Sequence, residues 1–220
     1  GSHSLRATST DSSGNVSAQS SAYSVTIDTT APGAPAISGL SAGSDSGSSA
    51  SDGITNSAAI TAPNNAESAA KVEYRVTKGT GPSAVVGAWS TTYTAPVADG
   101  SNDGVYTVEL RQTDLAGNIS VPQSITFTLD SSKPATPNAT ITDSTNGQDA
   151  AFANDGITNT ATVNVSGLET GATWEYSVDG GTFTAGTGTS FNLTAGSHTY
   201  SVRQTDAAGN TSRASTAVTY

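Results

Sequence analysis

The chain has 220 residues and a formal net charge of −10, and only 12% of its residues are charged, about half of the usual share of roughly 25%. The acidic balance argues against nucleic acid and anionic membranes as partners, because both attract basic patches. The absence of cysteine excludes a thiol nucleophile and a thiolate zinc site. No apolar run approaches the roughly 18–20 residues of a membrane span, so no membrane insertion is expected.

The start of the chain predicts an incomplete unit. Gly1-Ser2-His3 is typical of an expression-tag remnant, so residues 1–3 are left out of the fold prediction. Residues 4–30 contain the turn signal Asp11-Ser-Ser-Gly14-Asn15. We interpret this segment as the closing hairpin of a preceding β-sandwich, although a lone hairpin is only marginally stable in water.

Residues 31–130 show the alternation of half-buried strands. Apolar residues recur at every second position, and charged or polar residues lie between them. A period of two over several residues places one set of side chains on a core face. The apolar set comprises Val72, Tyr74, Val76, Val108 and Leu110. This segment is predicted to be the first complete sandwich domain.

Residues 131–220 repeat the same pattern and predict a second domain. Trp174 is expected to fill the centre of its core, and His198 stands where the first domain has Tyr106, so we interpret it as a packing residue and not as a ligand or base. The aromatic side chains are more typical of a core than of a sugar-binding platform. The alternating set here comprises Trp174, Tyr176, Val178, Tyr200 and Val202.

Internal repeats define the organisation of the chain. Three signals return in the same order in both domains: an Asp-x-x-x-Pro linker, the sequence Asp-Gly-Ile-Thr-Asn, and the motif Arg-Gln-Thr-Asp-x-Ala-Gly-Asn. Strand signals at this spacing are typical of a seven-strand sandwich. The predicted fold class is therefore all-β, with two complete immunoglobulin-like sandwiches in tandem after the N-terminal hairpin. The paired motifs begin at Asp28 and Asp130, at Asp52 and Asp155, and at Arg111 and Arg203.

Acidic residues from distant loops are predicted to meet at the seam between the two domains. Strands alternate in direction, so Asp45, Asp52 and Asp130 of the first domain and Asp206 of the second face one junction. Clustered carboxylates repel one another, and Ca²⁺ neutralises them with about 6–8 oxygen ligands. Asp28 and Asp114 would form the matching half-site at the other end of the first domain. Asp155 would lie in a further site at the far end of the second.

A second interpretation of the same aspartates stays open. Asp-x-x-Gly-Asn is also an ordinary hairpin connection, in which Gly adopts the left-handed conformation and Asp or Asn closes the turn. Asp-Gly likewise suits a turn that enters a strand. Each Asp taken singly is therefore explained as a turn residue. Only the convergence of several loops at one end favours a metal.

The motifs together resemble the bacterial immunoglobulin-like (BIg) repeats of giant type I-secreted adhesins and biofilm-associated proteins of Gram-negative bacteria. The resemblance is carried by Asp28-Thr-Thr-Ala-Pro32, by Asp45 through Asp52-Gly-Ile-Thr, by Val178-Asp-Gly-Gly181 and by the Arg-Gln-Thr-Asp motif. It implies an extracellular or cell-surface rod that carries a distal binding domain, with Ca²⁺ stiffening the joints. It assigns ligand roles to Asp28, Asp114, Asp130 and Asp206, and then to Asp45, Asp52 and Asp155.

The function expected from these features is a structural spacer. Its partners would be neighbouring repeats of the same chain, and a host or biofilm surface would be reached only through distal domains. A monomer is expected. The alternative is that the domains bind a carbohydrate or host-surface ligand directly, around Trp89 and Tyr93. No enzyme is expected, because the sequence has no phosphate loop or histidine metal cluster.

Overall fold

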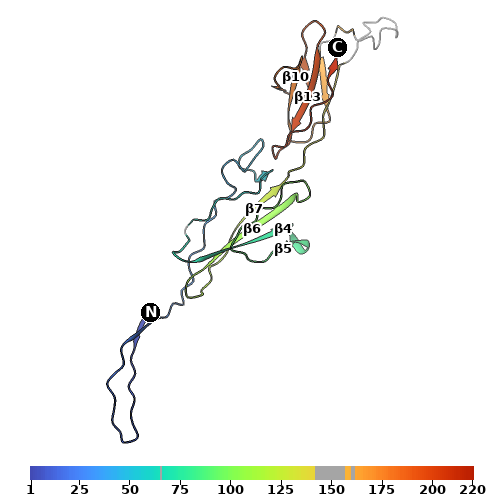
Figure 1. Cartoon of the computed structure of the whole chain (residues 1–220). Coiled ribbons are helices and arrows are strands. Elements are labelled where there is room, and N and C mark those ends of the chain that lie inside the picture. Colours follow the sequence, from blue (N-terminus) through green and yellow to red (C-terminus); the bar gives the residue numbers. More distant parts are fainter. Residues whose placement is uncertain (65, 142–156, 160–161) are drawn as a thin grey trace.

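The computed structural model describes residues 1–64, 66–141, 157–159 and 162–220. Over these residues the chain is built from strands, and a short 3-10 turn, η1 (Gly81–Ser83), is its one helical element. None of the described helical structure is long and apolar enough to cross a membrane. The predicted all-β class is confirmed, with two immunoglobulin-like sandwiches in tandem behind an N-terminal hairpin (Figure 1). We name the sandwiches domain 1 and domain 2 and keep the predicted boundaries.

The N-terminal hairpin consists of β1 (Ser2–Leu5) and β2 (Tyr23–Thr26), which pair in antiparallel register. Ser2 and His3, interpreted from the sequence as tag residues, pair with Thr26 and Val25 and so form part of β1. Almost every side chain of the hairpin is exposed. It therefore has no core of its own.

Domain 1 has one regular sheet and one irregular layer. The sheet order is β3-β7-β6-β4-β5, in which β3 runs parallel to β7. Among the described residues, the opposite layer is joined by the isolated bridges Ala36–Asn64 and Leu40–Ile60 and not by a continuous ladder. Pro35 offers no N–H donor and Gly39 has a φ of 133°, so the first strand does not continue its ladder. The strands are β3 (Ile54–Thr55), β4 (Lys71–Lys78), β5 (Val85–Val86), β6 (Gly104–Thr113) and β7 (Gln123–Leu129).

Domain 2 shows the seven strands that the sequence predicts for each unit. One sheet has the order β11-β10-β13-β14 and the other has the order β12-β9-β8. This division into a four-stranded and a three-stranded sheet is that of an immunoglobulin-like sandwich. The strands are β8 (Asn138–Ile141), β9 (Thr162–Ser166), β10 (Thr173–Val178), β11 (Thr184–Ala185), β12 (Ser190–Asn192), β13 (Thr199–Thr205) and β14 (Val218–Thr219).

Each sandwich buries its own core, as the alternation predicts. Val108 and Leu110 are fully buried in domain 1, and Tyr200 and Val202 are almost fully buried in domain 2. Trp174 lies in the domain 2 core, where Tyr176 and Phe191 stack with ring centroids 4.2 Å apart. His198 differs from the prediction: its ring nitrogens contact Asp179 and Thr194. It is a polar contact and not a packing residue.

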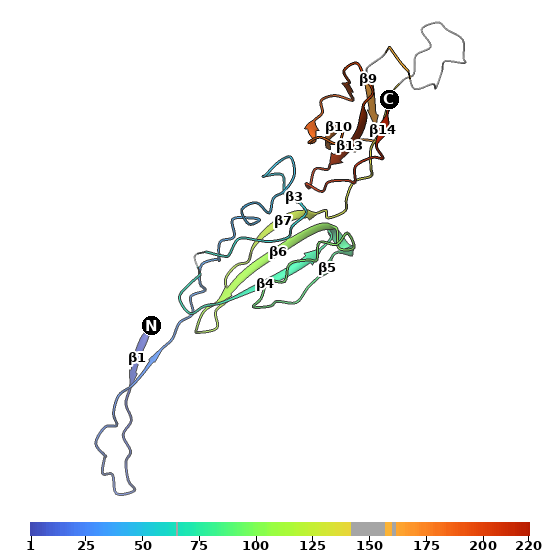
Figure 2. The same cartoon turned by 45° about the horizontal axis from the view of Figure 1, so that its top comes forward.

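The units follow one another along an extended path. Figures 1 and 2 show the N-terminal hairpin, domain 1 and domain 2 end to end, with the N-terminus where the hairpin meets domain 1 and the C-terminus in domain 2. The end of β7 leads directly into the linker to domain 2. The closing turn after β13 points back toward domain 1, so the predicted junction lies between these two elements.

Candidate functional site

The motif Asp-x-Ala-Gly-Asn closes a tight turn in both domains. In domain 1 the Asp114 Oδ1 accepts hydrogen bonds from the backbone N–H groups of Ala116 and Asn118, both at 2.9 Å. The Asn118 side-chain amide donates to the Asp114 Oδ2 at 2.8 Å. The pKa of Asp114 is lowered, first by this side-chain bond from Asn118. Gly117 adopts a φ of 94°, which an L side chain rarely tolerates.

The second copy repeats the two bonds from the asparagine in a different environment. Asp206 Oδ1 accepts from the Asn210 N–H at 2.8 Å, and its Oδ2 accepts from the Asn210 amide at 3.0 Å. Asp206 and Asn210 are buried, whereas Asp114 and Asn118 are half-buried. The turn interpretation of these aspartates therefore describes the hydrogen bonds that they make.

The asparagine of each turn also reaches the preceding linker. Asn118 Nδ2 donates to the carbonyl oxygen of Asp28 at 3.2 Å, and Asn210 Nδ2 donates to that of Asp130 at 2.9 Å. Each pair of predicted ligands, Asp28 with Asp114 and Asp130 with Asp206, is thus linked through one side-chain amide. The structure builds the same joint twice.

A buried glutamine fixes the linker on its other side. Gln112 and Gln204, from the Arg-Gln-Thr-Asp motif, are 1% and 0% exposed. Gln204 Nε2 donates to the carbonyls of Ala135 at 2.7 Å and Gly167 at 3.1 Å, and its Oε1 accepts from the N–H of Glu169 at 2.8 Å. Gln112 makes the corresponding bonds to the Gly33 carbonyl and the Glu67 N–H in domain 1. These bonds satisfy the buried side-chain amide of each glutamine and tie it to the backbone of the linker and of a neighbouring loop.

Asp130 has the most acidic environment of the predicted ligands. Its Oδ1 accepts from the Ser132 N–H at 3.2 Å. Its pKa is raised, first by burial and then by the negative charges of Asp206, Asp103 and Glu169. Acids from distant parts of the chain therefore do approach Asp130. Neither Asp45 nor Asp52 is among the charges that act on it.

The other predicted ligands are held within their own loops. Asp45 Oδ2 accepts from the Gly53 N–H at 3.3 Å, and its Oδ1 is buried without a hydrogen-bond partner. Asp52 Oδ1 accepts from the Ile54 N–H at 2.9 Å, and Asp28 Oδ1 accepts from the Thr30 N–H at 3.0 Å. Asp155 lies outside the described residues.

Ca²⁺ fits this joint by donor chemistry but not as a preformed site. The oxygens around Asp130 are hard donors of the kind that Ca²⁺ prefers. Asp103, however, already accepts bonds from Ser131 and Ser132, and Asp206 accepts bonds from Asn210. Within the described ranges no group of three acidic or histidine side chains is close enough to hold a metal ion.

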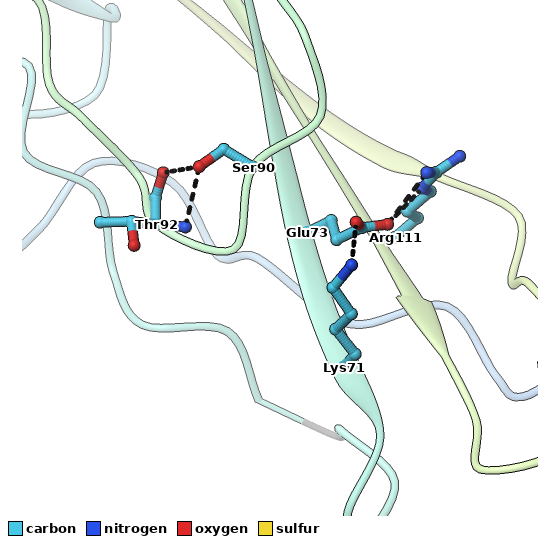
Figure 3. A network of polar contacts seen from close by, with 5 residues as sticks. All are labelled: Lys71, Glu73, Ser90, Thr92 and Arg111. Carbon is cyan, nitrogen blue, oxygen red and sulfur yellow. Dashed lines mark hydrogen bonds and ion pairs between the residues drawn. The ribbon is translucent and has the colours of Figure 1, made fainter.

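The residues of the alternative ligand-binding surface have other contacts. The Trp89 ring lies 4.2 Å from the Arg111 guanidinium carbon and 4.6 Å from that of Arg75, measured to the ring centroid. Figure 3 shows Arg111 and Lys71 on the two carboxylate oxygens of Glu73, in the charged layer to which this tryptophan belongs. Trp89 therefore stacks on the charged outer face of the sheet and does not plug the core.

Tyr93 is a core residue. Its hydroxyl donates to the Ala58 carbonyl at 2.6 Å, and its ring centroid lies 5.9 Å from that of Tyr74. Burial raises its pKa to about 12. A tyrosine held in this way does not present a free face to a sugar.

Sequence reasoning missed five residues that contribute to the joints: the two glutamines, the two asparagines and Glu169. The glutamines carried a readable signal, because Gln112 continues the inward set of Val108 and Leu110 and is the polar member of it. A polar side chain on a core face has to find internal partners. The asparagines and Glu169 gave no such signal, since their partners lie in other loops.

Comparison with known proteins supports the fold and part of the identification. A family model described as a bacterial Ig-like domain matches residues 30–131. This segment is therefore similar to bacterial Ig-like domains, as expected for a bacterial Ig-like repeat. A search of curated proteins finds no match. Among solved structures, the chicken CNTN1 FN1-FN3 domains share 11% identity and a TM-score of 0.40, over all of this chain and 76% of that one. A likeness this distant carries no argument.

Proposed function

We propose that this chain is a non-enzymatic spacer segment of a large, repetitive bacterial surface adhesin, located outside the cell. The observation that carries the proposal is the joint that recurs along the chain. Asn118 and Asn210 each hold the carbonyl of the linker aspartate before their own domain, at 3.2 Å and 2.9 Å. A joint that repeats with the sequence motif suits a chain whose task is to set the distance between its ends.

The extended arrangement supports the same role. The hairpin and the two domains lie in line in both views, and no unit folds back on another (Figure 2). A spacer gains reach only when successive domains stay aligned, because domains joined by a short linker otherwise move independently. The charged outer layer around Glu73 and Arg111 is internally paired, which suits an exposed shaft.

We propose further that Ca²⁺ stiffens the joint between the two domains. Asp130 would hold the ion together with Asp206 and Asp103, the carboxylates whose charge raises the pKa of Asp130, once these side chains exchange their present hydrogen bonds for the ion. The ion would supply the positive charge that this group lacks. Extracellular modules of this kind bind Ca²⁺ at roughly 10⁻⁴–10⁻³ M, a range that is reached outside cells.

Small-angle X-ray scattering of the whole chain, with millimolar Ca²⁺ and with chelator, tests both parts. The spacer role predicts an extended particle in both conditions, and the calcium role predicts a smaller maximum dimension in chelator. Asp130→Asn is the variant that should abolish this dependence, and Asp28→Asn at the other joint is its control. A compact particle would contradict the spacer role, and identical curves in both conditions would contradict the calcium role.

A further inference from the structure

A loop of domain 1 touches the closing turn of domain 2 directly. The Ser46 hydroxyl donates to the carbonyl oxygen of Ala208. Gly47 lies so close that a Cβ built on it would overlap the backbone carbonyl of Ala207, and one built on Gly209 would come within 2.8 Å of the Gly47 nitrogen. Real Cβ atoms essentially never approach backbone so closely, so this contact requires glycine on both sides. We call Ser46 and Gly47 the docking tip.

The docking tip is braced on the sheet of domain 1. Ser46 Oγ accepts a hydrogen bond from the Asn56 N–H at 2.9 Å, and the buried Thr55 hydroxyl donates to the carbonyl of Ser44. Thr55 belongs to β3, which pairs with Leu129 of β7, the strand that leads into the linker. The docking tip and the linker are therefore both anchored to the same edge of the domain 1 sheet, the tip through β3 and the linker through β7.

Domain 1 thus holds the turn of domain 2 at two points. One is the carbonyl of Asp130, which accepts from the Asn210 amide, and the other is the docking tip. A single attachment leaves rotation about the linker free, whereas two attachments from one rigid edge remove it. The second point consists of backbone groups and one hydroxyl, so it needs no cation.

The matching turn at the other end of domain 1 serves as an internal reference. It has the same asparagine contact to the linker, but a Cβ built on Gly117 meets nothing within 4 Å. Ala116 is exposed, while its counterpart Ala208 is 0% exposed. The two turns share the hydrogen bonds from Asn118 or Asn210 to the turn aspartate, and they differ in the neighbour that covers them.

We propose that the docking tip is a metal-independent interaction element, whose partner is the Ala207–Gly209 turn of the following domain and which fixes the angle between successive domains. This inference rests on the proposed function, since it explains how the spacer keeps its units aligned. It adds a contact that forms without Ca²⁺ and that bound Ca²⁺ would reinforce.

The test is the distance between the two domains, measured in chelator by double electron–electron resonance. The chain has no cysteine, so Thr126→Cys and Thr173→Cys place one spin label on an exposed position of each domain. The parent pair should give one narrow distance distribution. Gly209→Ala should broaden it, and Gly117→Ala should leave it unchanged, because the two glycines have φ values of 91° and 94° and so suffer the same local strain.

A second pair of variants separates docking from folding of the turn. Gly47→Ala acts from domain 1 and should broaden the distribution while domain 2 is unaltered. Gly43→Ala, in the same loop at a φ of 76° with open space around it, should not. The inference is overturned if Gly47→Ala and Gly209→Ala give the narrow distribution of their controls. A narrow distribution that Ca²⁺ does not alter would contradict the calcium role while leaving the docking tip intact.

Discussion

The turn at Asp114–Asn118 and the turn at Asp206–Asn210 have the same motif and the same hydrogen bonds from asparagine to aspartate, yet one is open to solvent and the other is covered. Leu115 is 85% exposed and Ile119 is 49% exposed, whereas Ala208 has no exposed surface. The difference comes from the neighbouring loop and not from the turn itself. A repeated motif therefore fixes local geometry at every copy, while its contribution to stability depends on what precedes it.

Both joints share a buried glutamine, and we expect its substitution to lower the free energy of unfolding the most. Gln204→Ala should lower the free energy of unfolding of domain 2 by about 3 kcal/mol, because a fully buried side chain is removed together with its three hydrogen bonds. Gln112→Ala should destabilise domain 1 by a similar amount. Each domain has one tryptophan, so urea unfolding followed by fluorescence, with Trp89 or Trp174 replaced by phenylalanine in turn, reports each domain separately.

Packing and hydrogen bonding at this position can be told apart. Gln204→Met keeps most of the side-chain volume but makes none of the three hydrogen bonds. It should be nearly as destabilising as Gln204→Ala. A methionine variant as stable as the parent chain would show that the glutamine acts through its volume alone. The claim that its hydrogen bonds stabilise both joints would then be wrong.

Substitution of the alanine inside each turn should show the largest difference in stability between the two joints. Ala208→Leu should destabilise the docked arrangement by about 2 kcal/mol, because the added carbons meet a position without free space. Ala116→Leu should change stability by less than about 0.5 kcal/mol, since its side chain is exposed. The measurement is the unfolding free energy of the domain that carries each variant. Equal effects would mean that domain 1 does not cover the second turn.

Much of the fold could be predicted because it depends on residues close together in the sequence. Val108, Leu110 and Val202 alternate with polar neighbours, and all three are fully buried. The turns could be predicted because Asp, Gly and Asn each serve a local hydrogen bond or a local φ value. The position of Trp89 could not be predicted, because it depends on contacts with Arg75 and Arg111.

The joint could be predicted only in outline. The approach of acids to Asp130 follows from strand direction, and Asp206 and Asp103 do raise its pKa. The docking tip could not be predicted, because Gly47 stands in a run of Ser and Gly where Gly43 looks equivalent. Only the structure distinguishes them, since a Cβ on Gly43 meets nothing within 4 Å.

Substitution of the turn asparagines should also destabilise the second joint more than the first, but by a smaller margin. Asn210→Ala should destabilise domain 2 by about 1.5 kcal/mol, because a buried side chain loses its bonds to the Asp130 carbonyl and the Asp206 carboxylate. Asn118→Ala should destabilise domain 1 by about 0.5 kcal/mol, since water replaces the lost bonds at a half-exposed site. Thermal unfolding of both variants under one condition checks the order. The reverse order would contradict the assignment of the second joint as the tighter one.

Substitution of the linker aspartates should change the stability least, and whether Asp130→Asn stabilises or destabilises the chain should depend on Ca²⁺. The pKa of Asp130 is raised above its ordinary value of 3.8, first by burial. The folded state therefore binds this proton more tightly than the unfolded state, so the stabilisation is full below pH 3.8 and is lost as the pH rises through the raised pKa. At pH 7 in chelator, Asp130→Asn should be more stable than the parent chain, by less than about 1 kcal/mol.

Added Ca²⁺ should reverse this order, because an ion that binds only the folded joint stabilises the parent chain and not the variant. The quantity to measure is the difference in unfolding free energy between parent and variant from pH 3 to pH 7, in which the other carboxylates largely cancel. Asp28→Asn, at the exposed joint, is the matched control, and added Ca²⁺ should not change its stability relative to the parent chain. If Asp130→Asn stays the more stable chain in millimolar Ca²⁺, the acids around Asp130 are held by Ser131, Ser132 and Asn210 without an ion. The two joints would then differ only in the docking tip.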